Sequence, residues 1–425
     1  MPGKEATCAF HGIGQGLFYS CVIESEADVQ SCFRFVYDCG TFYKKDAQLL
    51  EEEIANCFHF SAFELEHDRH DDRPVIDALF ISHFDYDHIS GVPYLLKHYQ
   101  VRSVFIPYLT PEIMHLLELK AIEEGWSDED LQLFQDPFRY FSAHGCEAVF
   151  VIGALPSSDD RIIKEYDERQ FRWRTEEFSF RDGVVVRHDA IHGGITETAQ
   201  YDCSSALTVR TYRADWEFRI YQDQPKEEQN KIADEIKKSL GNRSLDKLFT
   251  QTPQGKALLK DIKQLYQKVK NGINQSSMVL YHAPNANWAS VCFSRKPCSC
   301  YYRVNVCPNY DFFAGSLLTG DIDTNKLREQ GSRFLEYMGN LPIPVGFLQL
   351  PHHGSGHNLD LTLLAKFMEP QYAVFVCSYG IGNHFRHPDP HMLDQLESHR
   401  LAGQTAYQIN HVYQGKDFTY TIETA

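Results

Sequence analysis

The sequence predicts an α/β protein in which helices cover both faces of a layered sheet. Apolar runs of strand length alternate with segments whose apolar residues recur at helical spacing, and such alternation favours a layered arrangement. Clusters of His and Asp also fall just beyond several predicted strands. The chain has 425 residues, enough for one large or two ordinary domains, and 43% of them are hydrophobic. This composition predicts a folded core rather than disorder.

The first segment, residues 5–38, is expected to form strands joined by a glycine-rich turn. The turn, Gly12-Ile13-Gly14-Gln15-Gly16, leads into a strand rather than a helix, which excludes a dinucleotide-binding fingerprint. The strand over residues 33–37 is followed by Asp38, Cys39 and Gly40. A helix is expected over residues 47–57, and a loop rich in His and acidic residues over residues 58–72.

The central motif follows an apolar run, residues 75–81, that is typical of a buried strand. His83, Asp85, Asp87 and His88 come within six residues, and the apolar positions after them recur at helical spacing. His and carboxylate side chains are ligands for borderline and hard divalent cations. One ion could not take four ligands from so short a loop without strain. We therefore expect two neighbouring ions, with His83 and Asp85 on one and Asp87 and His88 on the other.

The alternation of strands and helices continues to the end of the chain. Strands are predicted over 101–106, 148–152, 345–350, 373–377, 406–409 and 418–422, and a hairpin over 201–212 and 216–221. Helices are predicted over 112–124, 128–143, 324–338 and 392–401.

The motif at residues 83–88 resembles the His-X-His-X-Asp-His signature of the metallo-β-lactamase superfamily. Asp in place of the second His is the variant found in the metallo-β-lactamase-like domain of ComEC-type DNA-uptake proteins and in some phosphodiesterases. The Gly-Gln-Gly turn and the strand that ends in Asp38 are similar to further parts of these domains. The resemblance covers residues 5–205 and 271–425. It implies one metallo-β-lactamase-fold domain over residues 1–425, a four-layer αβ/βα sandwich with its metal site where the strand-end loops meet.

The resemblance also assigns roles to later motifs. Asp38 would support the metal loop through hydrogen bonds. Residues 274–280 resemble the strand that precedes the next metal motif, and that motif, residues 315–321, ends in Asp321. Asp321 would offer one oxygen to each of two ions. In Pro351-His352-His353-Gly354-Ser355, His353 would complete the second ion's set with Asp87, His88 and Asp321, while His352 would orient a ligand or contact substrate.

Residues 378–388 resemble the Gly-X-X-Asn-X-X-X-His-Pro segment of the same domains. His387 is expected to face the metals, as a ligand or as a proton donor to the leaving group. Asn383 and Arg386 are expected to contact phosphate. The third ligand of the first ion stays open between His192, His387 and water, since many superfamily members take a His near residues 188–192.

Residues 226–270 interrupt the family pattern. They are helical in composition and hold 11 Lys or Arg against 6 Asp or Glu, in a chain whose net charge is −17. We expect a two-helix basic insertion over residues 223–272. It either docks an anion, a nucleic acid strand or an acidic protein partner, or it pairs with its own acidic body.

Cysteine content and hydropathy bear on metal sites and location. Most of the 12 cysteines stand singly in apolar segments, where a reduced thiol behaves as a small hydrophobic group. Cys292, Cys298, Cys300 and Cys307 could form a zinc site, but they lack the usual paired spacing.

No run of 18 apolar residues occurs, so we expect a cytoplasmic protein without a membrane partner rather than a DNA-uptake channel.

These observations favour a metal-dependent hydrolase. The carboxylates of Asp85, Asp87 and Asp321 make an oxygen-rich site that suits Zn²⁺ or Mn²⁺ and fits a phosphoryl substrate better than an amide. With the ComEC-type resemblance, this favours a phosphodiesterase or nuclease that acts on DNA or RNA through a hydroxide activated by two metal ions, with Asp87, His352 and His387 as catalytic residues.

Two alternatives stay open. One is a hydrolase of small esters, thioesters or cyclic nucleotides, which the acidic body favours because it would repel a long polyanion. The other is an effector subunit of a bacterial defence complex that a partner ATPase or sensor activates.

Overall fold

The computed structural model describes residues 4–155, 178–294 and 313–424 apart from short gaps. The gaps are residues 26–27, 59–66, 69–70, 184, 189–190, 193–196, 212–213, 224–225, 241–251, 286–288, 330–332, 365, 367–372 and 402–407.

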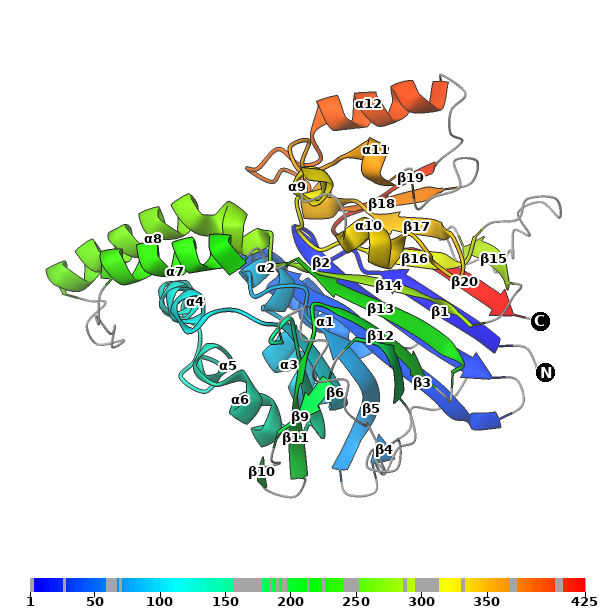
Figure 1. Cartoon of the computed structure of the whole chain (residues 1–425), viewed down its shortest axis with the longest axis horizontal. Coiled ribbons are helices and arrows are strands. Elements are labelled where there is room, and N and C mark those ends of the chain that lie inside the picture. Colours follow the sequence, from blue (N-terminus) through cyan, green and yellow to red (C-terminus); the bar gives the residue numbers. More distant parts are fainter. Residues whose placement is uncertain are drawn as a thin grey trace.

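Two β-sheets pack face to face and helices cover their outer faces (Figure 1). The first sheet has the order β10-β11-β7-β6-β5-β3-β2-β1-β20-β15, with β4 paired to β5 and β9 to β11. Its strands are β1 Lys4–Phe10, β2 Gly16–Ser25, β3 Asp28–Thr41, β4 His67–Asp68, β5 Asp71–Phe80, β6 Gln100–Pro107, β7 Ala148–Ile152, β9 Val185–Arg187, β10 Ile191–His192, β11 Glu197–Cys203, β15 Ala289–Ser294 and β20 Phe418–Thr424.

The second sheet has the order β19-β18-β17-β16-β14-β13-β12-β8. Its strands are β8 Phe178–Asp182, β12 Ala206–Thr211, β13 Trp216–Gln222, β14 Met278–Pro284, β16 Gly315–Leu318, β17 Val345–Gln349, β18 Val374–Ser378 and β19 Gln408–Val412.

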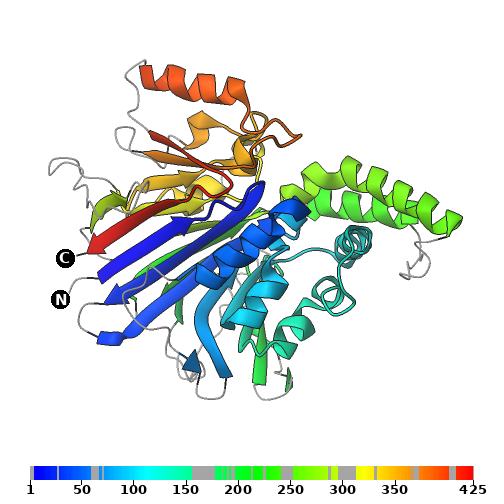
Figure 2. The same ribbon diagram turned by 180° about the vertical axis from the view of Figure 1, so that it is seen from behind.

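The helices fall into two groups that follow the chain. The helices of the first half are α1 Ala47–Asn56, α2 Tyr86–Ile89, α3 Val92–His98, α4 Pro111–Glu124, α5 Gln132–Gln135 and α6 Pro137–Ala143, and those of the last third are α9 Thr324–Glu329, α10 Arg333–Met338, α11 Leu361–Leu364 and α12 Pro390–Leu401. The first group covers the first sheet and the second group covers the second sheet (Figures 1 and 2).

Three buried apolar clusters correspond to the three interfaces of this arrangement. One joins α1 and α3–α6 to the first sheet, one fills the space between the sheets, and one joins α9–α12 to the second sheet. Between the sheets, the Phe35 ring of β3 meets Phe80 of β5 at 6.0 Å and Phe218 of β13 at 5.1 Å, both edge to face. The predicted α/β sandwich of two sheets covered by helices is therefore confirmed.

Parallel pairing places the carboxyl ends of several strands at common edges. β3, β5, β6, β7 and β11 are parallel neighbours in the first sheet, and β16, β17, β18 and β19 in the second. The loops that carry the His and Asp motifs follow β5, β16, β17 and β18. This is why motifs far apart in the sequence can meet in one place.

The basic insertion forms two helices, α7 Lys226–Leu240 and α8 Pro253–Asn274, which lie side by side and project from the body next to α4 (Figures 1 and 2). Their apolar stripes are buried: Ile236, Ile262 and Leu265 belong to the same cluster as the buried side of α4. Lys237 pairs with Glu112 at 3.0 Å and Lys263 with Glu123 at 3.8 Å, so part of the insertion's positive charge is matched by the acidic α4.

Several boundaries differ from the sequence prediction. The segment 201–212 is not one arm of a hairpin: it breaks after Cys203, so that β11 lies in the first sheet and β12 pairs with β13 in the second. The helix predicted over 128–143 divides at Asp136. The side chain of Asp136 caps α6 by accepting a hydrogen bond from the Arg139 amide.

Two further predictions were also too coarse. β5 already begins at Asp71, within the predicted loop, and the helix predicted over 324–338 is observed as α9 and α10. Of the cysteine cluster, Cys292 lies in β15, while Cys298, Cys300 and Cys307 lie outside the described residues. In the described part of the chain, every helix is too short or too polar to cross a membrane.

Candidate metal centre

Five side chains from three strand-end loops converge at the edge of the two sheets. His83 follows β5, Asp87 and His88 lie in α2, Asp321 follows β16, and His353 follows β17. His88 Nε2 lies 3.2 Å from Asp321 Oδ1, and His353 Nε2 lies 3.3 Å from Asp87 Oδ2 and 3.8 Å from Asp321 Oδ1. His83 Nε2 lies 3.9 Å from Asp321 Oδ2. The structure therefore brings together five of the six predicted ligands.

These atoms fit a divalent metal ion. The Nε2 atoms of His83, His88 and His353, and Oδ1 of Asp321, are buried and lack a hydrogen-bond partner. Buried polar atoms without partners are costly, and divalent cations bound among these atoms would provide the missing partners. Two groups have ligand atoms within 4.8 Å of one another: His83, His88 and Asp321, and Asp87, His88 and His353. Imidazole nitrogens with carboxylate oxygens suit zinc and related divalent ions.

Hydrogen bonds behind the ligands orient their rings. Asp38 accepts hydrogen bonds from the Ser82 amide at 2.7 Å and the Ser82 hydroxyl at 2.6 Å, and its Oδ2 lies 2.8 Å from His88 Nδ1. Ser82 Oγ also lies 2.9 Å from His83 Nδ1, and His353 Nδ1 lies 3.0 Å from the Ser378 carbonyl oxygen. With each Nδ1 engaged in this way, Nε2 is left for a metal. Asp38 thus has the geometry expected of a residue that supports the metal loop.

The backbone at the site is held in an unusual conformation. Asp38, His352 and His353 have φ values of 55°, 49° and 56°, in the left-handed region that L side chains rarely adopt. A Cβ on Gly40 would lie 2.6 Å from the backbone of His88, which is why the residues after Asp38 include a glycine. Strained residues of this kind cluster at functional sites.

Electrostatics leaves Asp87 and His83 in the protonation states that bind a metal. Burial alone would raise the pKa of Asp87, but the close contact with His353 and the charge of His88 hold that pKa far below its usual range. Burial, together with the neighbouring His88, lowers the pKa of His83 to about 4. At neutral pH the Asp87 carboxyl is therefore ionised and the His83 ring is neutral, the forms in which both can ligate.

Asp85, the sixth predicted ligand, lies in a different environment. Its two carboxylate oxygens each lie 2.5 Å from the hydroxyl of Tyr266 in α8, and Lys120 Nζ of α4 lies 3.6 Å from its Oδ1. Burial would raise the pKa of Asp85, but the ammonium groups of Lys120 and Lys270 outweigh it and lower that pKa. The carboxylate is thus ionised and satisfied by the protein, and its role as a ligand stays a prediction.

His352 and His387 line the accessible side of the cluster. His352 Nε2 lies 3.5 Å from Asp321 Oδ2, and the two imidazole rings are 5.5 Å apart. Burial, with the nearby His353 and His352, lowers the pKa of His387 to about 4. His387 is therefore neutral at neutral pH, which suits a ligand or a proton acceptor. Donation to a leaving group would require a bound anion to raise its pKa.

The two predicted phosphate contacts differ from each other. The Asn383 amide group donates to the carbonyl oxygens of Gly380 at 2.7 Å and His387 at 2.6 Å, and its Oδ1 accepts from the His387 amide at 3.0 Å. Asn383 is thus occupied in shaping the loop that carries His387. Arg386 is exposed, with a φ of 60°.

The histidines near residue 190 lie elsewhere. β10, which contains His192, is the last strand of the first sheet, at the end of the molecule away from α2 (Figure 1). His188 is exposed and its Nε2 lies 2.7 Å from Asp202. The structure does not bring His188 to the cluster.

Three residues at the site escaped the sequence analysis: Lys120, Tyr266 and Lys270. Tyr266 and Lys270 belong to the basic insertion, and the Lys120 ammonium lies 3.9 Å from the centre of the Tyr266 ring. Net positive charge drew attention to the insertion as a whole. No local pattern distinguished Lys270 from the other lysines of α8.

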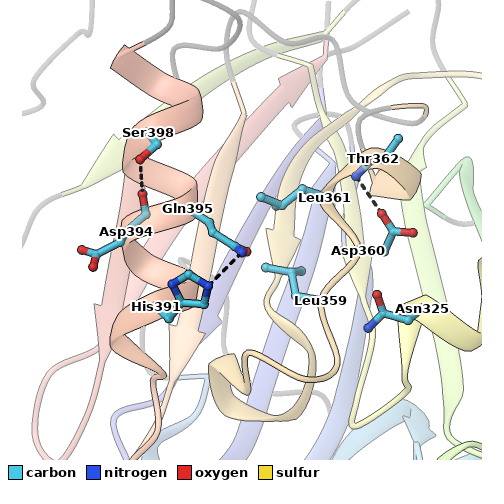
Figure 3. A pocket seen from close by; sticks show the side chains of 9 residues that line it. All are labelled: Asn325, Leu359, Asp360, Leu361, Thr362, His391, Asp394, Gln395 and Ser398. Atoms are coloured by element: carbon cyan, nitrogen blue, oxygen red, sulfur yellow. Dashed lines mark hydrogen bonds between the residues drawn. The ribbon is translucent and has the colours of Figure 1, made fainter.

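A cavity of about 410 Å³ lies apart from this cluster, between α12 and the segment around α11. Figure 3 shows its lining, where Asp360 accepts a hydrogen bond from the Thr362 amide and Gln395 lies 3.3 Å from His391. None of the predicted site residues lines it. The cavity is therefore not the place where the metal-centre chemistry would occur.

Comparison with protein families gives one match. Residues 33–197 match the family model of the metallo-beta-lactamase superfamily, a stretch that includes Asp38 and the motif His83–His88. The match implies a metal-dependent hydrolase of a superfamily that typically binds divalent metals, often zinc. It supports the superfamily and not the ComEC-type resemblance, and it ends before Asp321, His353 and His387. A comparison with curated proteins finds no match.

Proposed function

We propose that the protein is a metal-dependent phosphodiesterase or nuclease. The observation that carries this proposal is the position of Lys270. It lies in the last turns of α8, and its positive charge acts on the carboxylates of Asp85, Asp87 and Asp321 and on the rings of His352 and His387. Among the residues that the structure describes, Lys270 has no ion-pair partner within 4.0 Å. A cation that faces the ligands and makes no ion pair with a described residue suits a substrate that carries a negative charge of its own.

The donor set of the centre supports a phosphoryl substrate. Asp87 and Asp321 supply carboxylate oxygens beside the imidazoles, and oxygen-rich sites stabilise the charge of phosphoryl groups. Divalent ions bound here would lower the pKa of water and neutralise charge on the phosphoryl oxygens. The chain's own residues would bind the substrate, orient it and transfer the proton.

Each of these residues has a role that its position allows. Lys270 would hold a non-bridging oxygen of the phosphodiester and fix its orientation. His387 lies on the accessible side and would exchange a proton with the leaving oxygen once the bound anion raises its pKa. Asn383, through its three hydrogen bonds, would keep His387 in place.

Matched substrates test the proposal. The protein loaded with Zn²⁺ or Mn²⁺ is assayed on a phosphodiester, a phosphomonoester, a neutral thioester and a lactone. We expect measurable kcat/KM only for the phosphodiester. We also expect Lys270→Met to lower that kcat/KM by about 100-fold, the usual cost of removing one group that stabilises transition-state charge.

Lys268→Met is the control, because Lys268 lies on the same helix, is largely exposed and pairs with Glu235. It should leave kcat/KM unchanged. Faster hydrolysis of the thioester or lactone, with no effect of Lys270→Met, would contradict the proposal and favour the small-ester hydrolase. Activity that emerges only when a protein partner is added would favour an effector subunit.

A further inference from the structure

Two loops from opposite ends of the chain join their aromatic rings beside the metal centre. Phe42 and Tyr43 follow β3, and His384 and Phe385 follow β18. The Phe42 ring centre lies 5.1 Å from that of Phe385 and 5.6 Å from that of His384, and the His384 and Phe385 rings are 3.9 Å apart. The Tyr43 hydroxyl lies 2.8 Å from His384 Nδ1 and accepts a hydrogen bond from the His384 amide at 3.0 Å. We call these four residues the aromatic ledge.

The ledge is continuous with the metal centre. The Phe385 ring is parallel to the His387 ring within 8°, with centres 6.0 Å apart. Lys270 Nζ lies 5.7 Å from the Phe385 ring centre. A substrate that places its phosphate at Lys270 and the metal ligands would therefore have its next group beside the ledge.

The ledge is partly accessible, and cations stand on its two loops. His384 is exposed and Phe42, Tyr43 and Phe385 are half-buried, in contrast to the aromatic rings between the sheets. Ile381, a few residues before His384, is 56% exposed. The cations Lys44, Lys45 and Arg386 are exposed on the same two loops, and Lys45 Nζ lies 5.2 Å from the Tyr43 ring centre.

Aromatic rings interleaved with cations are the usual means of binding single-stranded nucleic acids. Bases stack on the rings while cations follow the phosphates, and the stacking tolerates any base sequence. On a chain with a net charge of −17, such a local concentration of cations favours the binding of a polyanion at the ledge.

We propose that the aromatic ledge stacks a base of single-stranded DNA or RNA next to the phosphodiester held at Lys270. This inference rests on the proposed function, since it places the ledge next to the scissile phosphate. It adds the class of substrate, a flexible strand with accessible bases, and the residues that would recognise it.

Binding measured without turnover tests the ledge. Fluorescence anisotropy of metal-free protein is recorded with a short single-stranded oligonucleotide and with the same strand carrying abasic sites, as DNA and as RNA. We expect the strand with bases to bind about tenfold more tightly than the abasic strand, as stacking of one or two bases would give. Phe385→Leu, which keeps an apolar side chain, should remove most of this difference and leave abasic binding within about twofold.

Phe138→Leu is the control, because Phe138 is a partly buried aromatic of α6 that packs against the core. It should leave both affinities unchanged. Equal binding of the two strands by the unaltered protein, or an equal loss for both in Phe385→Leu, would overturn the ledge.

The two proposals fail separately. If the protein hydrolyses phosphodiesters but binds the two strands equally, the proposed role of the ledge is refuted and the proposed phosphodiesterase activity stands. If the protein binds the strand with bases more tightly but hydrolyses no phosphodiester, the proposed role of the ledge stands and the proposed phosphodiesterase activity is refuted.

Discussion

Asp85 and Asp87 stand two residues apart in one loop, and the structure places them in opposite situations. Asp87 Oδ2 faces His353 Nε2 at 3.3 Å, in a group of atoms that could hold a metal ion. Asp85 is buried against the hydroxyl of Tyr266 and the ammonium of Lys120. Both carboxylates are ionised. Asp85 is held by protein groups, whereas Asp87 lies among the candidate metal ligands.

The comparison shows that a ligand motif in the sequence predicts which residue types can bind a metal. It does not predict which other side chains each of them contacts in the folded protein. The loop His83–His88 supplies two carboxylates at equivalent spacing. The insertion then determines which of them is free, because α8 brings Tyr266 to Asp85 and Lys270 to the ligand cluster. The two-helix insertion thus contributes side chains to the candidate site.

The largest expected effect separates the two aspartates by activity. Asp87→Ala should lower the rate of phosphodiester hydrolysis by about 1,000-fold or more, because it removes a ligand whose charge and position the chemistry needs. Asp85→Asn, which keeps the shape and one acceptor for Tyr266, should lower the rate by about tenfold at most. Initial rates with saturating metal check both, and circular dichroism verifies that the variants are folded. Full activity of Asp87→Ala would refute the site.

The next largest effect concerns Asp38, whose hydrogen bond orients the ligand His88. Asp38→Asn leaves every ligand in place but weakens the hydrogen bond that orients His88. We expect metal affinity to fall by about 10- to 100-fold, as is typical when such a partner is altered. Competition with a metal indicator dye measures the dissociation constant. An unchanged constant would mean that His88 is not a ligand.

A smaller effect tests whether Asp85 stays with Tyr266 when metal binds. Tyr266→Phe should lower the free energy of unfolding by about 1.5–3 kcal/mol, because it removes a hydrogen bond to a buried charge. If Asp85 remains with the protein, the loss should be the same with and without saturating Zn²⁺. Urea denaturation in both conditions measures it. A loss that vanishes with metal would show that the ion takes over Asp85.

The last effect is a pH dependence of stability that distinguishes the two histidines of the loop. The pKa of His83 falls from 6.5 to about 4 on folding, so the unfolded chain binds more protons between these values. In the metal-free protein this residue makes stability decrease as pH falls from 6.5 to 4, by at most about 1.4 kcal/mol per pH unit. His83→Gln should remove that slope.

His88 should act in the opposite direction. Burial would lower its pKa, but Asp321 and Asp38 outweigh burial and raise the pKa well above 6.5. Its contribution is present below pH 6.5 and is lost as pH rises through the raised value. Chemical denaturation of His83→Gln and His88→Gln over a pH series compares the two. A shared direction would contradict the assigned environments.

The sequence sufficed where a feature is local. Strand period predicted the layered fold, and the His and Asp positions at one strand end predicted the ligands of the loop His83–His88. The family resemblance of the later motifs added Asp321 and His353, which the structure brings to the same place. The sequence analysis failed where tertiary packing determines which residues are in contact. Neither the separation of β11 from β12 into different sheets nor the contact of Tyr266 with Asp85, 181 residues earlier, leaves a trace in local spacing.

Anomalous X-ray diffraction from crystals soaked with Zn²⁺ or Mn²⁺ tests the central claim most directly. We predict a peak within about 2.0–2.2 Å of His88 Nε2, His353 Nε2 and carboxylate oxygens of Asp87 and Asp321, with Asp85 still hydrogen-bonded to Tyr266. A metal bound elsewhere, or none at this cluster at saturating concentration, would contradict the account.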